Sequence, residues 1–494
     1  MVFPTLIGGF MYFSNIGVDA TQVQRPPNGH QDNAWKGIIV DTLGLNTLSG
    51  LDARHHIHGN TNPRAVVENG AMVMTGGSGI RVTDEDGKQY IEGLAGLWCA
   101  SLGFNEERLV VAAEKQMREL PYYHGFFGRA PVPTIKLAAK LAEITPEGIE
   151  KFFFACSGSE AIDTAIKMVW YFNNSKGRPA KKKIISRQNS YHGVTVAGAS
   201  LTRIPINQDG FDLPIERFLQ IGGSHFYRYG EVGETEEAFV ARRATELEQL
   251  IQDEGPDTIA AFFAEPVQGA GGVLPPAKGY FDAIQPILKK YDILFVVDEV
   301  ICGFGRTGNL FGSETYNLRP DIMTMAKGLS ASYQPISAVG ITQDVFEGIQ
   351  ELGDQKGAFG HGFTYGGHPV AAAVALEAQN IYQERDIVGH VRAIAPVFQA
   401  RLNALSEHHL VGETRGVGLL GAVEMVADKA TKERFDPSLG LGVKVFDEAK
   451  KNGLLFRNAD DQLLFCPPLI VTENDVNEIF DILQHALDRV SANL

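Results

Sequence analysis

Short apolar runs alternate with helical segments through the middle of the chain. The runs are residues 151–155, 183–186, 259–264 and 293–297. Strands that are apolar on both faces are typical of a parallel sheet buried between two layers of helices. The pattern therefore predicts an α/β fold with a mostly parallel sheet. In such folds ligands bind in the crevice outside the carboxyl ends of the strands.

The two flanks of this region have other patterns. Residues 80–92 predict a β-hairpin with Asp86-Gly87 as its turn. The C-terminal part has a long alanine-rich helix, strand-like pieces near 418–424 and 462–465, and a capping box at 472–475 that begins the last helix. No internal repeat or low-complexity linker separates the parts. We therefore expect domains that pack tightly against each other.

The segments that these patterns predict are an N-terminal extension at 1–34, a first part of a smaller domain at 35–93, a large domain at 94–367 and a second part of the smaller domain at 368–494. With 494 residues the chain is too long for one simple core, and two or three domains are expected.

Composition and charge narrow the possible functions. The chain is 44% hydrophobic and 21% charged, which is ordinary for a globular protein. A formal net charge of −15 disfavours a protein that binds a phosphate backbone. The basic cluster at 181–183 is interpreted as the solvated lead-in to a strand. We expect no nucleic-acid partner.

The cysteines and the N-terminal residues indicate the cellular compartment and whether a metal motif is present. The four cysteines form no CxxC pair, so no zinc or redox motif is present, and isolated cysteines fit a reducing compartment. No apolar stretch is long enough to span a bilayer. Residues 1–13 are apolar without a basic region before them, and residues 1–34 lack the arginines of a typical transit peptide. We expect a cytoplasmic location, with organellar import through the extension left open, and no metal and no membrane partner.

Two residues suggest covalent cofactor chemistry. Lys327 is a lone cation in an apolar, small-residue run, and Asp298 ends the run 293–297. A desolvated lysine has a lowered pKa and can attack a carbonyl to form a Schiff base. A carboxylate at the end of a buried strand can hold a ring nitrogen protonated. Together they suggest a pyridoxal phosphate enzyme, although a lysine at a strand edge and an acidic strand cap have the same local pattern.

Three further motifs follow predicted strands. Ser157-Gly158-Ser159 precedes a helix, whose N-terminus with small hydroxyl residues suits a phosphate. Tyr191-His192 offers an aromatic ring that could stack on a flat cofactor. Glu265 begins a glycine-rich loop that permits close approach of a ligand. Taken alone these are also an ordinary N-cap, a packed loop tyrosine and a tight loop, but with Asp298 and Lys327 they place five loops at one edge.

The sequence resembles a class III (ω-type) aminotransferase of the fold-type I pyridoxal phosphate enzymes. The likeness runs from about residue 50 to the C-terminus and is carried by 298–308, 326–329 and 362–369. Stretches 51–63 and 190–201 are most similar to pyruvate-dependent ω-transaminases and 4-aminobutyrate:pyruvate aminotransferases. The resemblance implies a large domain with a mostly parallel seven-stranded sheet, a smaller α+β domain built from both ends of the chain, and pyridoxal 5'-phosphate as cofactor.

The resemblance also implies roles for site residues. Lys327 would bind the cofactor covalently and then shuttle the proton, and Asp298 would pair with the pyridinium nitrogen. Residues 157–159 would hold the phosphate. Thr364 would reach the phosphate of the partner subunit's cofactor, so the enzyme would be a homodimer with shared sites, with a tetramer left open.

Further roles concern the ring and the substrate. Tyr191 would stack on one face of the ring and Val300 on the other, with His192 and Glu265 beside them. Arg415 would be a mobile arginine that binds the substrate carboxylate and pairs with Glu265 when no carboxylate is bound. The residues expected to line the substrate pockets are Trp98 and Phe126.

Three positions depart from the pattern of relatives. Cys156 stands where many have asparagine, and Gly366 stands where similar enzymes have serine. Ile301 replaces a glutamine of some 4-aminobutyrate:2-oxoglutarate enzymes, which favours pyruvate as the acceptor. None of these departures touches Lys327 or Asp298.

The leading hypothesis is an aminotransferase that moves an amino group from an ω-amino acid or amine donor to a keto acid, expected to be pyruvate, with ping-pong kinetics. A second hypothesis is another reaction on the same fold, such as a racemase or a decarboxylating dialkylglycine-type transaminase. A third, from another class, is a non-catalytic dimeric scaffold. The presence of both Lys327 and Asp298 argues against the scaffold.

Overall fold

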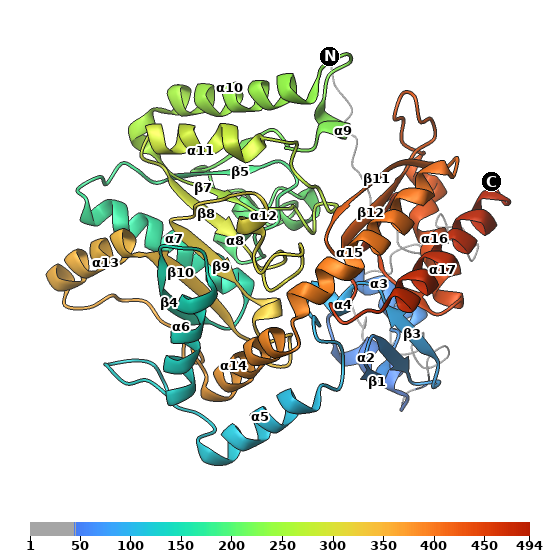
Figure 1. The fold of residues 1–494 in the computed structure, drawn as a ribbon, viewed down its shortest axis with the longest axis horizontal. Helices are drawn as coiled ribbons and strands as arrows, with labels where there is room; N and C mark the ends of the chain where they lie inside the picture. Colours follow the sequence, from blue (N-terminus) through green and yellow to red (C-terminus); the bar gives the residue numbers. More distant parts are fainter. Residues whose placement is uncertain (1–43, 45) are drawn as a thin grey trace, which may run out of the picture.

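A computed structural model describes residue 44 and residues 46–494. The predicted extension at 1–34 lies outside the described residues. The described chain forms a large body around one extended sheet and a smaller body in which both ends of the chain meet (Figure 1). None of the helices in the described part combines the length and apolar composition needed to span a bilayer.

A seven-stranded sheet forms the centre of the large body. Its strands, in spatial order, are β4 (Ile149–Ala155), β10 (Ser337–Thr342), β9 (Ile322–Met325), β8 (Leu294–Asp298), β7 (Ile259–Ala264), β5 (Lys183–Arg187) and β6 (Phe218–Ile221). The five strands from β9 to β6 are parallel, and β10 is antiparallel to both of its neighbours. The predicted mostly parallel sheet of an α/β fold is confirmed.

Helices cover both faces of this sheet (Figure 1). On one face α7 (Gly158–Ser175) and α13 (Gln343–Lys356) pack with α8 (Val196–Leu201). On the other face lie α10 (Glu236–Glu254) and α11 (Tyr280–Lys290). β7 and β8 are buried along their whole lengths, because side chains on each face meet a helical layer. This explains the wholly apolar runs in the sequence.

Another helical layer lies at the lower edge of Figure 1 and joins the two bodies. It consists of α5 (Glu107–Glu119), α6 (Val132–Ile144) and α14 (Pro369–Glu384), and α14 packs against both of the others. α14 is the predicted alanine-rich helix, whose small side chains allow close packing.

The smaller body contains two four-stranded sheets. One has the order β1 (Met74–Ser78), β2 (Arg81–Asp84), β3 (Gln89–Glu92) and β13 (Leu454–Leu455). The predicted hairpin is the β2–β3 pair, with Gly87 at φ 80° in its turn. β13 pairs in parallel with β3, so residues from both ends of the chain share one sheet.

The second sheet has the order β11 (Val411–Val417), β12 (Leu420–Met425), β15 (Gln462–Phe465) and β14 (Arg457–Ala459). Three helices cover it, α15 (Ile387–Ala404), α16 (Leu441–Lys451) and α17 (Glu473–Ser491). The predicted capping box is present: Thr472 accepts from the N–H of Asp475, and the Asp475 carboxylate accepts from the N–H of Thr472. The exact domain boundaries stay a prediction.

The remaining described elements are short. They are α2 (Leu48–His55), α3 (Pro63–Asn69), α4 (Ala95–Trp98), α9 (Phe226–Tyr229), α12 (Gly312–Thr315), and the 3-10 turns η2 (Pro205–Asn207), η3 (Pro256–Thr258), η4 (Lys327–Leu329), η5 (Leu405–Glu407) and η6 (Pro437–Leu439).

Candidate active site

Lys327 lies directly after β9, at the carboxyl edge of the parallel strands. Its backbone has φ 48°, in the left-handed region that non-glycine residues rarely adopt, so the surrounding structure holds it there. Burial lowers the pKa of its amine, while the nearby Cys99 and Asp298 oppose this shift. Among the described residues no hydrogen bond or ion pair engages its Nζ. The amine is therefore suited to act as a nucleophile.

Asp298 ends β8, the neighbouring parallel strand, and is 4% exposed. Its Oδ2 accepts from His192 Nδ1 at 2.8 Å. Its Oδ1 accepts from the Thr324 hydroxyl and the Val300 N–H, both at 3.1 Å. Within residues 46–494 no lysine or arginine forms an ion pair with this carboxylate, so it remains able to balance a buried cation.

His192 is held between the carboxylate and the sheet. It is 1% exposed, its ring lies edge-on to Phe263, and its N–H backbone group donates to the Thr202 hydroxyl at 2.8 Å. Because Asp298 accepts at Nδ1, Nε2 is the free nitrogen, and it has no hydrogen-bond partner among the described residues. His192 therefore fixes the orientation of Asp298.

Glu265 follows β7 and connects two of the predicted loops. Its Oε1 accepts from the N–H of Tyr191 at 3.0 Å, and its Oε2 accepts from the N–H of Gly269 at 2.9 Å. Burial raises the pKa of this carboxyl group. The Tyr191 backbone is thereby fastened to the end of β7, beside Asp298 at the end of β8.

The N-terminus of α7 forms the fourth part of the site. Ser157 caps the helix by accepting from the N–H of Glu160 at 3.2 Å. The hydroxyl of Ser159 accepts from the N–H of Val194 at 3.1 Å. Among the described residues no hydrogen bond uses the N–H groups of Gly158 and Ser159. Free N–H groups at the start of a long helix suit an anion.

Close packing explains why glycine is needed at two positions here. A Cβ on Gly158 would lie 3.2 Å from Cγ1 of Val300, so the Val300 side chain rests against the helix start. A Cβ on Gly193 would lie 2.5 Å from the Ser159 hydroxyl. The Val300, Tyr191 and α7 motifs are therefore neighbours in space, as the sequence predicts.

Of the three other predicted site residues, Trp98 packs beside this group, whereas Phe126 and Thr364 share no contact with it among the described residues. Trp98 is 3% exposed and packs in a core cluster with Val267, Ile301 and Cys466. The Phe126 ring lies against Gly362, where a Cβ would approach it to 2.6 Å. Thr364 is exposed, and its carbonyl accepts from the Tyr122 hydroxyl at 2.9 Å. The segments that carry Phe126 and Thr364 therefore contact each other.

The geometry of Arg415 differs from the expectation for a mobile arginine. It is 6% exposed, and its Nη1 donates to Glu413 at 2.8 Å and to Glu424 at 2.6 Å. Glu265, its expected partner, accepts hydrogen bonds from the backbone N–H groups of Tyr191 and Gly269 instead. The expected Arg415–Glu265 pair is therefore absent from the described contacts. The pairing was wrong because two nearer carboxylates, both on the same sheet as Arg415, satisfy its charge.

A different arginine, Arg457 on β14, lies near the ring-stacking candidate. Its positive charge acts on the Tyr191 hydroxyl and opposes the burial that raises the tyrosine pKa. Arg415 has no such effect on Tyr191 and acts on Tyr227 instead. Sequence reasoning missed Arg457, because the strand β14 is only three residues long and gives no periodic signal.

Comparison with known proteins identifies the family. Residues 64–487 match the family model of the class-III aminotransferases. The chain belongs to the class-III aminotransferases. Over 417 residues it is 49% identical to tomato (Solanum lycopersicum) mitochondrial gamma aminobutyrate transaminase 1. The aligned region covers 84% of this chain and 81% of the tomato protein.

Solved structures agree with this assignment. The ω-transaminase of Pseudomonas jessenii in complex with PMP is 50% identical, with a TM-score of 0.89 over 90% of this chain and 98% of that one. A transaminase solved with L-alanine is 51% identical, with a TM-score of 0.84 over 85% of this chain and 100% of that one. The predicted fold-type I architecture and aminotransferase activity are confirmed, and neither the racemase-type nor the scaffold alternative is favoured.

One further neighbour is informative about substrate residues. It is a thermostable ω-transaminase variant engineered for asymmetric synthesis of bulky amines, 49% identical, with a TM-score of 0.89 over 90% of this chain and 99% of that one. It is substituted at a tryptophan, a phenylalanine and an arginine. In its numbering these three positions have the same spacing as Trp98, Phe126 and Arg457 have here.

Class-III aminotransferases use pyridoxal phosphate, and the residues of this site fit that group. Asp298 offers a buried carboxylate without a lysine or arginine partner among the described residues, which a pyridinium proton would complete. Lys327 offers a desolvated amine that has no hydrogen-bond or ion-pair partner among the described residues. Residues 157–159 offer unused N–H groups and hydroxyls at a helix N-terminus. A flat ring with a phosphate at one end and a nitrogen at the other matches this distribution.

Outside this site, one group of side chains has the composition of a metal site. Asp52, His56 and His58 bring their possible ligand atoms within 4.8 Å of one another. Both histidines hydrogen-bond to Asp52, at 2.8 and 2.7 Å, and His56 is exposed. These hydrogen bonds satisfy the three side chains without an ion.

The lowered pKa of Lys327 predicts how cofactor loading depends on pH. The amine must be neutral to attack the cofactor aldehyde, so loading of the apoenzyme should accelerate as pH rises and level off well below the ordinary lysine pKa of about 10.4. The measurement is stopped-flow absorbance of the lysine-bound cofactor between pH 6 and 11. Lys327→Ala is the control and should give no such band and no turnover. A midpoint at or above the ordinary lysine pKa would contradict the desolvation of this amine.

Proposed function

We propose that the enzyme transfers an amino group from an ω-amino acid or amine to pyruvate by a ping-pong mechanism. The observation that carries the choice of acceptor is the 51% identical transaminase solved with L-alanine. Alanine is what pyruvate becomes when it receives an amino group. The acceptor is therefore a short keto acid.

The donor class has separate support. The tomato relative is named for gamma-aminobutyrate, an ω-amino acid, and the solved neighbours are named ω-transaminases. Ile301, which is 7% exposed and packs with Trp98, offers no polar group for a second carboxylate of a dicarboxylic acceptor. This agrees with pyruvate rather than 2-oxoglutarate as the acceptor.

We assign the proton chemistry to two residues. Bound pyridoxal phosphate supplies an electron sink that stabilises negative charge at the substrate carbon. Asp298 holds the proton on the pyridine nitrogen, and His192 with Thr324 keeps the carboxylate in place. Lys327, as a neutral amine, would take the proton from the donor carbon and return it to carbon C4′ of the cofactor.

Other residues hold the cofactor in position. Ser157, Gly158 and Ser159 bind the phosphate through hydroxyls and N–H groups. Tyr191 covers one face of the ring and Val300 the other; the second position is supported by the contact of Val300 with the α7 start.

The carboxylate of the keto acid is proposed to bind Arg457 rather than Arg415. Arg457 lies near Tyr191, at the end of a short strand, and its position repeats that of the substituted arginine in the engineered neighbour. A guanidinium binds a carboxylate with two parallel hydrogen bonds. Trp98 and Phe126 are proposed to shape the substrate pockets, on the same spacing argument.

Arg457→Ala tests the acceptor and its binding group together. The variant should raise KM for pyruvate by about tenfold to hundredfold, because a charge-assisted hydrogen bond contributes about 1.5–3 kcal/mol, and leave KM for an arylalkylamine donor nearly unchanged. The measurement is steady-state kinetics with each substrate varied. The wild-type enzyme should also prefer pyruvate to 2-oxoglutarate in kcat/KM.

Arg415→Ala is the comparison variant. It should raise KM for pyruvate less than Arg457→Ala does, because Arg415 is not proposed to contact the substrate carboxylate. If Arg415→Ala selectively weakened pyruvate and Arg457→Ala did not, Arg415 would be the carboxylate residue after all. A preference for 2-oxoglutarate would remove pyruvate from the proposal.

The enzyme is proposed to act as a homodimer in which Thr364 reaches the partner's cofactor. Exposed aromatic residues surround this position and define an aromatic patch: Tyr122, Tyr123, Phe127 and Tyr365. Phe127 is 87% exposed and Tyr365 is 63% exposed, which is unusual for rings of this size on a free surface. A second copy of the chain would cover the patch and bring Thr364 to a cofactor phosphate.

Phe127→Asp tests the dimer. A charge in the centre of the patch should shift the protein from dimer to monomer in sedimentation velocity and reduce bound cofactor. Val232→Asp, at another fully exposed apolar position, is the control and should change neither. A wild-type protein that is monomeric at micromolar concentration and still active would rule out the shared site.

We propose a cytoplasmic location, and the competing location is an organelle, since the tomato relatives are named mitochondrial and chloroplastic. A fusion of residues 1–494 to a fluorescent protein distinguishes the two. Diffuse fluorescence supports the cytoplasm. Fluorescence in mitochondria or plastids that is lost on deletion of residues 1–34 would overturn this location.

A further inference from the structure

Arg415 connects the smaller body to a loop of the large body. Its Nε donates to the carbonyls of Gly272 at 3.1 Å and Val273 at 3.0 Å, and its Nη2 donates to Gly272 at 2.8 Å. Nη2 also donates to Oε1 of Gln462 at 2.6 Å. Arg415 lies on β11, whereas the two carbonyls belong to the glycine loop, residues 265–274, that follows β7.

The charge of Arg415 is fully balanced where it lies. Glu413 and Glu424 accept from Nη1, and Glu424 also pairs with Arg228. Glu413 in turn contacts His225 at 3.0 Å. All the N–H directions of the guanidinium are occupied, so a rotation of this side chain would break several buried hydrogen bonds at once. The Arg415 side chain is therefore fixed in one orientation and holds the groups that it contacts in place.

The glycine loop is closely packed against its neighbours. A Cβ on Gly271 would lie 2.0 Å from the Asn189 carbonyl, and a Cβ on Gly269 would lie 2.5 Å from Cδ1 of Ile301. Gln268 and Leu274 exchange backbone hydrogen bonds across its base, at 2.8 and 3.2 Å. A displacement of the loop at Gly272 must therefore move its other end as well.

The other end of the glycine loop leads to the cofactor site. Gly269 donates its N–H to Glu265, and the same carboxylate accepts the N–H of Tyr191. A continuous set of hydrogen bonds thus runs from Arg415 through the loop and Glu265 to the tyrosine proposed to cover the cofactor ring. Every group in it is buried or nearly so.

The same residue also fixes the sheet that carries Arg457. Gln462, which accepts from Arg415, pairs with Ala459 of β14, and Arg457 begins that strand. Arg415 therefore contacts one group on the cofactor side and one on the substrate side. Their separation sets where a keto acid lies relative to the ring.

We propose that Arg415 is a positioning residue that clamps the glycine loop to the β11–β12–β15–β14 sheet and so sets the spacing between Tyr191 and Arg457. Its effect on the substrate rests on the proposed role of Arg457, whereas its effect on the loop and on cofactor affinity does not. Loss of the clamp should loosen the loop, weaken cofactor binding and lower kcat/KM.

The test compares Arg415→Gln and Arg415→Lys with two controls. Hydrogen exchange of peptides within residues 266–274 and titration of the apoenzyme with pyridoxal phosphate are the main readouts. In Arg415→Gln, loop exchange should accelerate and the cofactor dissociation constant should rise roughly tenfold, as expected for a coupled residue outside the binding contacts. Arg415→Lys should recover thermal stability but not loop protection, since an ammonium cannot reproduce the planar fork.

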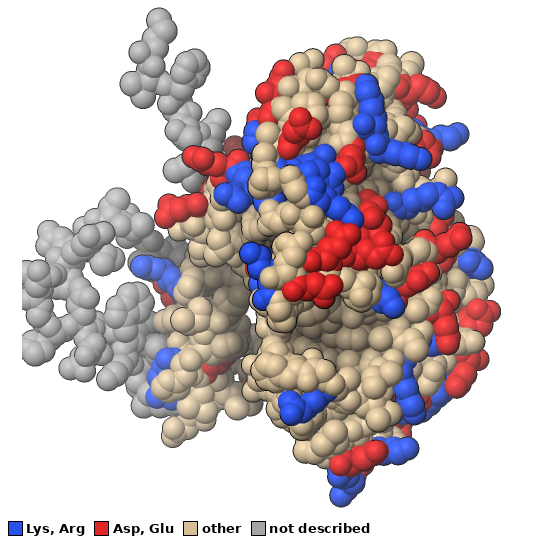
Figure 2. Space-filling model, turned by 90° about the vertical axis from the view of Figure 1, so that its left-hand side faces the viewer, with Lys and Arg blue, Asp and Glu red and all other residues tan. Residues whose placement is uncertain are grey.

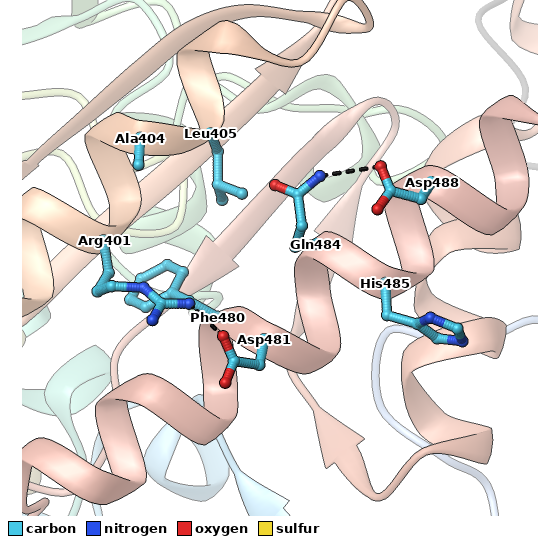
Figure 3. Close-up of a pocket in the computed structure, with 8 residues that line it drawn as sticks. All are labelled: Arg401, Ala404, Leu405, Phe480, Asp481, Gln484, His485 and Asp488. Atoms are coloured by element: carbon cyan, nitrogen blue, oxygen red, sulfur yellow. Dashed lines mark hydrogen bonds and ion pairs between the residues drawn. The ribbon is translucent and has the colours of Figure 1, made fainter.

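The controls separate positioning from general stability. Arg401→Gln removes a surface arginine that bonds to Asp481 and Asn477 on α17, beside a surface cavity of about 340 Å³ (Figure 3). Leu487→Ala destabilises the core of the smaller body without touching the loop. Neither should alter loop exchange or cofactor affinity, even when Leu487→Ala lowers the melting temperature as much as Arg415→Gln does.

Two results would overturn the proposal. One is loop exchange and cofactor affinity in Arg415→Gln that match those of Leu487→Ala at equal loss of melting temperature. The other is full recovery of all readouts by Arg415→Lys. If the loop loosens but KM for pyruvate is unchanged, Arg415 does not set the spacing between Tyr191 and Arg457, and that part of the proposal is overturned. The carboxylate-binding role of Arg457 is tested separately by Arg457→Ala, so the two ideas are distinguishable.

Discussion

The buried carboxylate of Asp298 is the constraint on which the site depends. It lies at the end of a strand inside the molecule, and its described partners are a histidine ring, a hydroxyl and a backbone N–H. A carboxylate without a strong cationic partner is costly to bury. The arrangement is favourable only if a cation comes to it, and a protonated ring nitrogen is such a cation. The fold fixes the orientation of the carboxylate, and the cofactor would supply its cationic partner.

The parallel sheet explains how distant sequence motifs reach that carboxylate. β7, β8 and β9 are adjacent and parallel, so Glu265, Asp298 and Lys327 leave the sheet at the same edge. The start of α7 and the Tyr191 loop lie against them. Acidic and basic side chains are interspersed over the face shown in Figure 2, without one continuous basic surface. At the site itself, desolvation strengthens the interactions of single charges.

The sequence was sufficient for the features that local chemistry determines. Wholly apolar runs identified β7 and β8, and the five strand-end motifs were placed at one edge correctly. It was insufficient where partners come from elsewhere in the chain. The family resemblance assigned the substrate carboxylate to Arg415, yet Glu424 on the neighbouring strand and the carbonyls of the glycine loop contact it. No property of the residues next to Arg415 in the sequence indicates either contact. The position of Arg457 likewise depends on the pairing of β14 with β15.

This division also separates chemistry from substrate choice. The groups that handle the proton, Lys327 and Asp298, are attached to the rigid central sheet. Arg457, the residue proposed to bind the substrate carboxylate, lies on a short strand at the edge of another sheet. Two rigid sheets can keep a fixed distance only if something ties them together across the interface between them. Arg415 is placed to do this, because its planar fork is satisfied by carbonyls on one side and carboxylates on the other at the same time. Arg415 would then influence which keto acids fit although it does not contact the substrate. It would do so by setting the spacing between the two sheets.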